Sequence, residues 1–219
     1  LLAQKDIYLK QSNFKEAERV GQQLSKRSPI FFNVLAEIYM HFNDYENAIQ
    51  AYQNLLNTNP NNANALIALH TIYLNKEDVG SQEKYLAKIE DNDMISIEIK
   101  KEIFYNLLRT NQYNNYPSFK AIVEKAILLH PKEPLFHLIL GDISSKEGSF
   151  KQAVKHYYSS LNSGLIKDEY IYTKLIEIHW QEEKTDSVLE VAQMAIERFP
   201  FTPTFYYYQG IALSNKGEH

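Results

Sequence analysis

Histidine and glutamate lie four residues apart in the segment EIHWQEE, where they are His179 and Glu183. On an α-helix this spacing places an imidazole and a carboxylate on one face, an arrangement that can hold zinc. No third ligand follows at a suitable spacing, which favours an interior histidine at position 179. Three further histidines, at His130, His137 and His156, are scattered along the sequence. We therefore predict no metal site.

The residue patterns of common enzymes are also missing. No Ser/His/Asp arrangement and no pair of catalytic carboxylates can be argued from the spacing of these residue types. Neither GxGxxG nor GxxxxGK[ST] occurs, so no nucleotide-binding loop is indicated. The chain has no cysteine, which excludes disulfides and thiolate metal ligands. We predict that the protein is not an enzyme and that it uses no cofactor.

One segment could contact a single-stranded nucleic acid, because Lys101, Tyr105 and Arg109 alternate basic and aromatic side chains at one-turn spacing. The net charge of -4 and the isoelectric point near 6.0 give no overall positive field to hold a phosphate backbone. Acidic residues are expected on the same surface, at Glu37, Asp142 and Glu177. This composition favours a solvated face of mixed charge, and partners that are proteins or peptides rather than nucleic acid.

No apolar run reaches the roughly 18 residues that a membrane span requires, so direct membrane insertion is not expected. The first residues, LLAQKD, include no initiator methionine and do not have the build of a signal peptide. We therefore expect the chain to be a fragment of a longer protein. A protein without disulfides is compatible with the cytoplasm and with the periplasm, so the compartment stays open.

The elements that position these residues follow a repeated layout. The segments NDYENAIQAYQNLLNTNP (43–60) and GSFKQAVKHYYSSLNSGL (148–165) each have a turn, an aromatic residue, an alanine three residues later and a tyrosine four beyond it. The alanines are Ala48 and Ala153. Positions equivalent to these two alanines recur at intervals close to ~34 residues, the length of a known helical repeat. We call these positions the repeat anchors, and the six are Ala17, Ala48, Gln82, Phe119, Ala153 and Val188.

Each repeat is expected to be a pair of helices. Phe32, Leu35, Ala36 and Tyr39 fall at positions i, i+3, i+4 and i+7 and form one apolar stripe. With 7 Gly and 7 Pro in 219 residues, a chain of many hairpins is disfavoured. We predict thirteen helices, six pairs plus one. Capping pairs are expected at Asn13 with Glu16, Asn43 with Glu46, and Ser149 with Gln152. A helix end is expected at Gly148, and first-turn prolines at Pro117 and Pro203.

This pattern resembles the tetratricopeptide repeat (TPR) family. One set of family slots is filled by Phe32, Leu35, Ala36, Tyr39, Ala48, Tyr52, Leu55 and Pro60, and a second by Leu140, Gly141, Ala153 and Tyr157. The copies around Gln82 and Phe119 have large or polar residues where a small one is usual. The resemblance implies an all-α fold, a right-handed α-solenoid of antiparallel helix pairs in a single domain over 1–219. The expected repeats are 1–28 (partial), 29–62, 63–96, 97–131, 134–167, 168–202 and 203–219 (first helix only).

For function, the resemblance implies a non-catalytic protein–protein interaction module that binds a peptide or a partner helix in a concave groove. The groove residues carried over onto this chain are Asn33, Glu37, His41, Ile67, Thr71, Lys101, Tyr105, Arg109, Leu138, Asp142, Thr173, Glu177, Trp180 and Tyr207. The family's Lys/Asn clamp for a C-terminal carboxylate is absent from the slots that Asn33, Glu37, Ile67 and Thr71 occupy. Trp180 is either an exposed anchor for the partner or a packing residue between neighbouring helices.

The alternative function is a structural scaffold segment that makes contacts through its ends or its convex face. The last helix is expected from Pro203 to Lys216, with one face packed on the preceding repeat through Tyr206, Gly210 and Leu213. Apolar residues are then expected on its outer surface, at Phe205, Tyr207, Tyr208 and Ile211. An exposed aromatic patch of this kind favours self-association around a two-fold axis.

Overall fold

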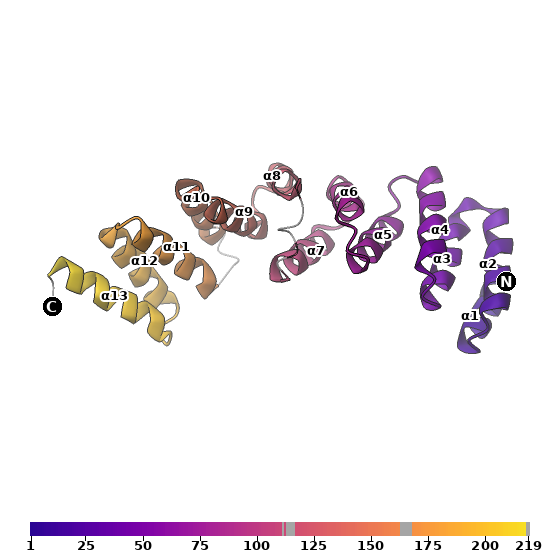
Figure 1. Cartoon of the computed structure of the whole chain (residues 1–219), viewed down its shortest axis with the longest axis horizontal. Coiled ribbons are helices and arrows are strands. Elements are labelled where there is room, and N and C mark those ends of the chain that lie inside the picture. Colours follow the sequence, from indigo (N-terminus) through magenta and orange to yellow (C-terminus); the bar gives the residue numbers. More distant parts are fainter. Residues whose placement is uncertain (111, 113–116, 163–167, 218–219) are drawn as a thin grey trace. The chain divides into compact units, whose positions relative to one another are not determined.

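The computed structural model describes residues 1–110, 112, 117–162 and 168–217. Within these residues the protein consists of thirteen α-helices and one short 3-10 helix, with no β-strand (Figure 1). The predicted all-α class and the predicted helix number are confirmed for this part of the chain. Two compact units are present, Leu1–Ile122 and Val123–His219, and the boundary between them falls inside helix α8.

The helices follow one another with short connections and pack as consecutive pairs within each unit. In the first unit they are α1 (Leu2–Lys10), α2 (Phe14–Arg27), the 3-10 helix η1 (Pro29–Phe31), α3 (Phe32–His41), α4 (Tyr45–Thr58), α5 (Ala63–Asn75), α6 (Val79–Glu90), α7 (Ile97–Arg109) and the start of α8 (Phe119–Leu129). The second unit contains the rest of α8, α9 (Pro134–Lys146), α10 (Phe150–Asn162), α11 (Glu169–Gln181), α12 (Thr185–Arg198) and α13 (Pro203–Lys216).

Short polar residues cap the N-termini of several helices that come second in their pair. The side chain of Asn13 accepts a hydrogen bond of 3.3 Å from the backbone N–H of Glu16, which confirms the expected cap of α2. In α4 the capping residue is Asp44 and not Asn43, because Asn43 adopts a left-handed conformation with φ of 60°. Asparagine tolerates this conformation better than most residues. The cap therefore moves one residue along the chain.

Glycine and proline mark several helix boundaries as expected, with one exception. Gly148 has φ of 72°, a left-handed conformation that terminates α9 at little steric cost. Pro203 occupies the first turn of α13, where its missing N–H would have no helical partner. Pro117, by contrast, precedes α8, which begins at Phe119. The prediction of Pro117 as a first-turn residue is wrong.

Small residues bring the helices of a pair close together. All six repeat anchors are buried, and the alanines among them are fully excluded from solvent. In the α9–α10 pair, the fully buried Tyr157 packs directly on Gly141, where an added Cβ atom would lie 2.6 Å from the tyrosine ring. No side chain fits at that distance. Glycine is therefore required at position 141 for Tyr157 to occupy the interior.

Polar groups take up interior positions in the α5–α7 segment (Ala63–Arg109). The buried Gln82 donates a hydrogen bond of 2.7 Å from Nε2 to the backbone carbonyl of Tyr73. The Lys100 Nζ atom donates to the backbone carbonyl of Glu90 at 2.5 Å and lies 3.9 Å from the Glu90 carboxylate, with both side chains almost completely buried. Asn92 is also buried. Hydrogen bonding lets Gln82 and Lys100 occupy positions that apolar residues fill elsewhere.

The last helix is rotated relative to the expectation. Phe205 and Ala212 are fully buried, whereas Tyr206 and Gly210 are exposed. The expected inner face, which included Tyr206 and Gly210, is therefore wrong by about one residue of helix rotation, or roughly 100°. The correct stripe follows from the fully buried Phe205 and its helix neighbour seven residues later.

No helix in the described part of the chain combines the length and the apolar character that a membrane crossing requires.

Candidate interaction surface

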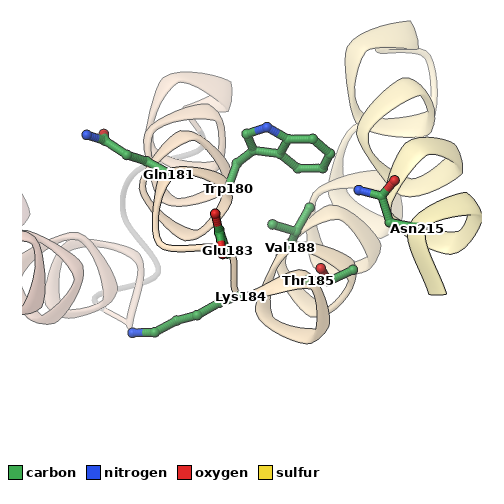
Figure 2. A pocket seen from close by; sticks show the side chains of 7 residues that line it. All are labelled: Trp180, Gln181, Glu183, Lys184, Thr185, Val188 and Asn215. Atoms are coloured by element: carbon green, nitrogen blue, oxygen red, sulfur yellow. The ribbon is translucent and has the colours of Figure 1, made fainter.

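A hollow of about 530 Å³ lies at one end of α11, α12 and α13 (Figure 2). It is lined by Trp180, Gln181, Glu183, Lys184, Thr185, Val188 and Asn215. Figure 2 shows the Trp180 indole on the side toward α12 and α13, while Gln181 and Lys184 point to the opposite side. The indole is 39% exposed. The hollow thus combines one large apolar wall with a polar rim.

Three aromatic rings connect this hollow to the last helix, and we call Trp180, Tyr208 and Tyr207 the aromatic row. The ring centroids of Trp180 and Tyr208 are 6.5 Å apart, and those of Tyr208 and Tyr207 are 5.8 Å apart in an edge-to-face arrangement. Both separations fall within the range of favourable aromatic pairs. Trp180 therefore packs against α13 and also keeps an exposed surface, and its role as an anchor for a partner stays a prediction. Tyr208 was expected on the outer surface of the last helix but was not among the predicted groove residues.

Charged side chains near the aromatic row form ion pairs with residues two or three positions away in the sequence. On α11, Lys174 binds the Glu177 carboxylate at 2.7 Å, and at the following turn Lys184 binds Glu182 at 3.0 Å. The hydroxyl of Thr173 donates to the backbone carbonyl of Glu169 in its own helix. These contacts are solvent-exposed and individually weak, so a partner can replace them at little cost.

The first unit presents its predicted surface residues on three helices. On α3, the Asn33 side-chain amide donates to Glu37 at 2.7 Å, and His41 is exposed at the end of the helix. On α5, the exposed Thr71 hydroxyl donates to the backbone carbonyl of the half-buried Ile67. The polar groups on these two helices are therefore mostly satisfied within their own helix.

Helix α7 carries the most accessible of these residues. Lys101, Tyr105 and Arg109 lie on successive turns, and i, i+4 spacing places them along one face. Tyr105 is 55% exposed and Arg109 is exposed, whereas Lys101 is half-buried. This face offers a solvated aromatic side chain between two cations.

Two predicted surface residues lie in the interior, and we remove them from the predicted groove. Leu138 and Asp142 on α9 are only 5% and 6% exposed. The Asp142 Oδ1 atom accepts hydrogen bonds from the hydroxyls of Tyr157 at 2.7 Å and Tyr170 at 3.0 Å. Burial raises the pKa of the Asp142 carboxyl, and the two hydrogen bonds partly oppose that rise. Asp142 therefore fastens α9 to α10 and α11.

The histidines are arranged differently from the sequence expectation. His179 is buried, as expected, and burial lowers its pKa, while Glu183 lies in the turn after α11 with φ of 57°. The two do not share a helix. His137 and His156, which are scattered in sequence, lie on facing helices with their Nδ1 atoms 3.3 Å apart. Their positions on α9 and α10 are the only sequence signal that could have paired them.

Comparisons with known proteins agree on the type of fold. A sequence model of the family described as tetratricopeptide repeat matches residues 2–69. The crystal structure of MamA protein shares 19% identity with this chain, with a TM-score of 0.56, and the alignment covers 78% of this chain and 91% of MamA. A second crystal structure of MamA gives 18% identity and a TM-score of 0.52, over 76% of this chain and 95% of that one.

The PilF structure from Pseudomonas aeruginosa is 17% identical over 94% of this chain and 93% of its own, with a TM-score of 0.48. No sequence among the curated proteins matches the chain. The matched segment covers the first helix pairs, and similar pairs follow in both units. Stacked helix pairs that bury their apolar faces against neighbours form an α-solenoid, an architecture that serves as a protein-interaction module. The family match over residues 2–69 and the folds of the two MamA structures support an assignment to the tetratricopeptide repeat family.

Proposed function

We propose that the protein is a non-catalytic interaction module that holds an extended peptide or a partner helix against the first helices of its repeats. The observation that carries this proposal is the aromatic row beside the hollow of α11–α13. Large, rigid aromatic side chains that keep exposed surface at a hollow are typical anchors of binding energy. Trp180 is the central anchor, and Tyr207, which is 64% exposed, extends the contact.

The composition of the hollow indicates the kind of side chain that binds there. The indole of Trp180 provides an apolar surface, and the rim offers the amide of Asn215, the carboxylate of Glu183 and the hydroxyl of Thr185. A peptide that inserts one aromatic or aliphatic side chain while its backbone bonds to the rim would satisfy both parts. The remaining proposed contact residues are Thr173 and Glu177 in this unit, and Asn33, Glu37, His41, Ile67, Thr71, Lys101, Tyr105 and Arg109 in the first unit.

A selection of random peptides on the immobilised protein, followed by titration of the selected peptides, tests this function. Trp180 is the single tryptophan of the chain, so a peptide that enters the hollow should change the intrinsic fluorescence. Trp180→Ala should weaken binding by about 30-fold, because anchor residues contribute ~2 kcal/mol or more. Tyr45→Ala is the matched control, since Tyr45 is 38% exposed on a second helix and should be dispensable.

If the Trp180→Ala protein bound the peptides as tightly as the wild type, the proposal that they bind beside Trp180 would be contradicted. If substitutions at exposed positions on the second helix of a pair weakened binding instead, the alternative function would be favoured. In that case the protein is a structural scaffold that acts through its convex face. Circular dichroism of each variant confirms that its helices are intact before binding is compared.

We also propose self-association through the surface of α13. Phe201, in the turn before α13, is 95% exposed, and Tyr206 and Tyr207 on α13 are 46% and 64% exposed. A second molecule presents the same aromatic side chains for a two-fold contact. Sedimentation at rising concentration should show association that Tyr207→Lys weakens and Tyr45→Lys leaves unchanged. A wild-type chain that stays monomeric at high concentration would contradict this contact.

A further inference from the structure

Two histidines from different helices face each other inside the second unit. His137 lies on α9 and His156 on α10, and their Nδ1 atoms are 3.3 Å apart. The ring centroids are 5.6 Å apart, and both side chains are half-buried. The same helix pair is held together by Tyr157 on Gly141. The two imidazoles therefore meet across a well-packed interface rather than on mobile surface loops.

A backbone contact fixes the orientation of one ring. The Nε2 atom of His137 lies 3.4 Å from the carbonyl oxygen of Pro131. A carbonyl oxygen only accepts hydrogen bonds, so Nε2 carries the hydrogen and Nδ1 is the nitrogen with the free lone pair in neutral His137. Histidines that bind metals commonly donate their second ring N–H to a backbone carbonyl in this way.

With the Nδ1 atoms 3.3 Å apart and the ring centroids 5.6 Å apart, the two nitrogens point at each other, as in an N–H···N hydrogen bond. Binding of one ion would keep this separation of the nitrogens and turn both rings toward the ion. Zinc binds imidazole nitrogen at about 2.0–2.1 Å with tetrahedral angles, which sets neighbouring ligand nitrogens about 3.3–3.4 Å apart. Imidazole is a preferred ligand for zinc, copper and nickel, whereas magnesium and calcium prefer oxygen. The ligand chemistry therefore selects a divalent late transition metal.

We propose that His137 and His156 form a two-histidine site for a divalent transition-metal ion that fastens α9 to α10. In the described residues, no group of three or more His, Cys, Asp or Glu side chains is placed to hold an ion. Water therefore completes the coordination, and the affinity is modest, with a dissociation constant in the micromolar range or weaker. The alternative state of the pair is a single N–H···N hydrogen bond with no ion.

Calorimetric titration of the chelator-treated chain with zinc chloride tests the site. The wild type should bind one equivalent, and zinc should raise the melting temperature of the second unit by a few degrees, because ligands that bind only the folded state stabilise it. His137→Gln and His156→Gln should each weaken zinc binding at least tenfold. His41→Gln, which removes an exposed histidine on α3, is the matched control and should bind as the wild type does.

A readout on the wild-type chain keeps the test independent of how the variants fold. Nitrogen-15 spectra of the histidine rings should show both Nδ1 signals shifting on addition of zinc, and neither signal shifting on addition of magnesium. The metal site would be overturned if zinc left the Nδ1 signals unchanged, or if the wild type and both Gln variants bound zinc with equal affinity. The two histidines would then form only the hydrogen-bonded pair.

Discussion

The α9–α10 pair brings its helices together with a glycine and an aromatic ring, whereas the α5–α7 segment places charged and amide groups in the same kind of position. In the first region Tyr157 lies directly on Gly141. In the second, Lys100 and Glu90 are buried as an ion pair, and Gln82 replaces the small anchor residue. The repeat thus tolerates two ways of filling one interface.

The two regions should differ in how they respond to substitution. A close-packed apolar contact is damaged by added volume. A buried polar group is damaged by the loss of its partner, because the remaining group stays out of water without compensation. The α5–α7 segment should therefore be the more sensitive region to truncation and to pH, and the α9–α10 pair the more sensitive region to enlargement.

The largest effect is expected at the buried ion pair. Lys100→Met should lower the free energy of unfolding by about 3–5 kcal/mol, because it leaves the Glu90 carboxylate buried without its cation. Adding Glu90→Gln should recover much of this loss. Urea unfolding measures both changes, with Lys84→Met as a control at an exposed lysine. A loss below about 1 kcal/mol in Lys100→Met would show that the pair is not a sensitive point of the segment.

His70 should make the α5–α7 segment sensitive to acid. It is 3% exposed, its Nε2 atom has no hydrogen-bond partner in the described chain, and burial lowers its pKa from 6.5 to about 4. The unfolded chain therefore takes up this proton near pH 6.5, before the folded chain does. The stability contribution is complete above that pH and is lost as pH falls toward 4, by about 3 kcal/mol.

Unfolding free energies at pH 7 and pH 4.5 measure this dependence. His70→Phe should flatten it, and His41→Gln, at an exposed histidine, should leave it unchanged. An unchanged acid dependence in His70→Phe would assign the effect to other groups.

Gly141 should be the sensitive position of the α9–α10 pair. Gly141→Ala places a Cβ atom 2.6 Å from the ring of Tyr157, and the overpacking should destabilise the protein by about 1–3 kcal/mol. Gly210→Ala in α13 is a matched control, because no atom lies within 4 Å of its added Cβ. That change should stabilise the chain by about 0.5–1 kcal/mol through helix propensity. If the melting temperature changed in the same direction in Gly141→Ala and Gly210→Ala, the packing argument would be contradicted.

The smallest effect is expected at the cap of α6. The Asp78 carboxylate accepts hydrogen bonds from the Ser81 backbone N–H at 3.1 Å and from its hydroxyl at 2.8 Å, and these bonds lower the pKa of Asp78. Asp78→Ala should cost about 1 kcal/mol. Because the folded pKa is depressed, this contribution is present above pH 3.8 and is lost at lower pH. Asp93→Ala, at an exposed aspartate outside the helices, serves as the control in urea unfolding.

The helix pairs could be predicted because their signals are local. The apolar stripe of Phe32, Leu35 and Tyr39 depends only on the period of one helix, and the repeat anchors depend only on spacing. Cap positions were less certain, since Asn43 and Asp44 are both good capping residues and only the backbone conformation of Asn43 selects Asp44. The orientation of α13 was also misjudged, because tyrosine and phenylalanine on several faces leave its apolar stripe ambiguous.

The sequence by itself determined the fold class, the helix pairs and the anchors Ala48 and Ala153, because a repeated short-range pattern specifies each unit in the same way. Only the tertiary structure decided which polar groups are interior and which side chains meet. Asp142 is buried because the hydroxyls of Tyr157 and Tyr170 satisfy it, and His137 faces His156 because α9 and α10 pack side by side. Contacts between residues far apart in sequence depend on the packing of whole helices, and no local pattern encodes that packing.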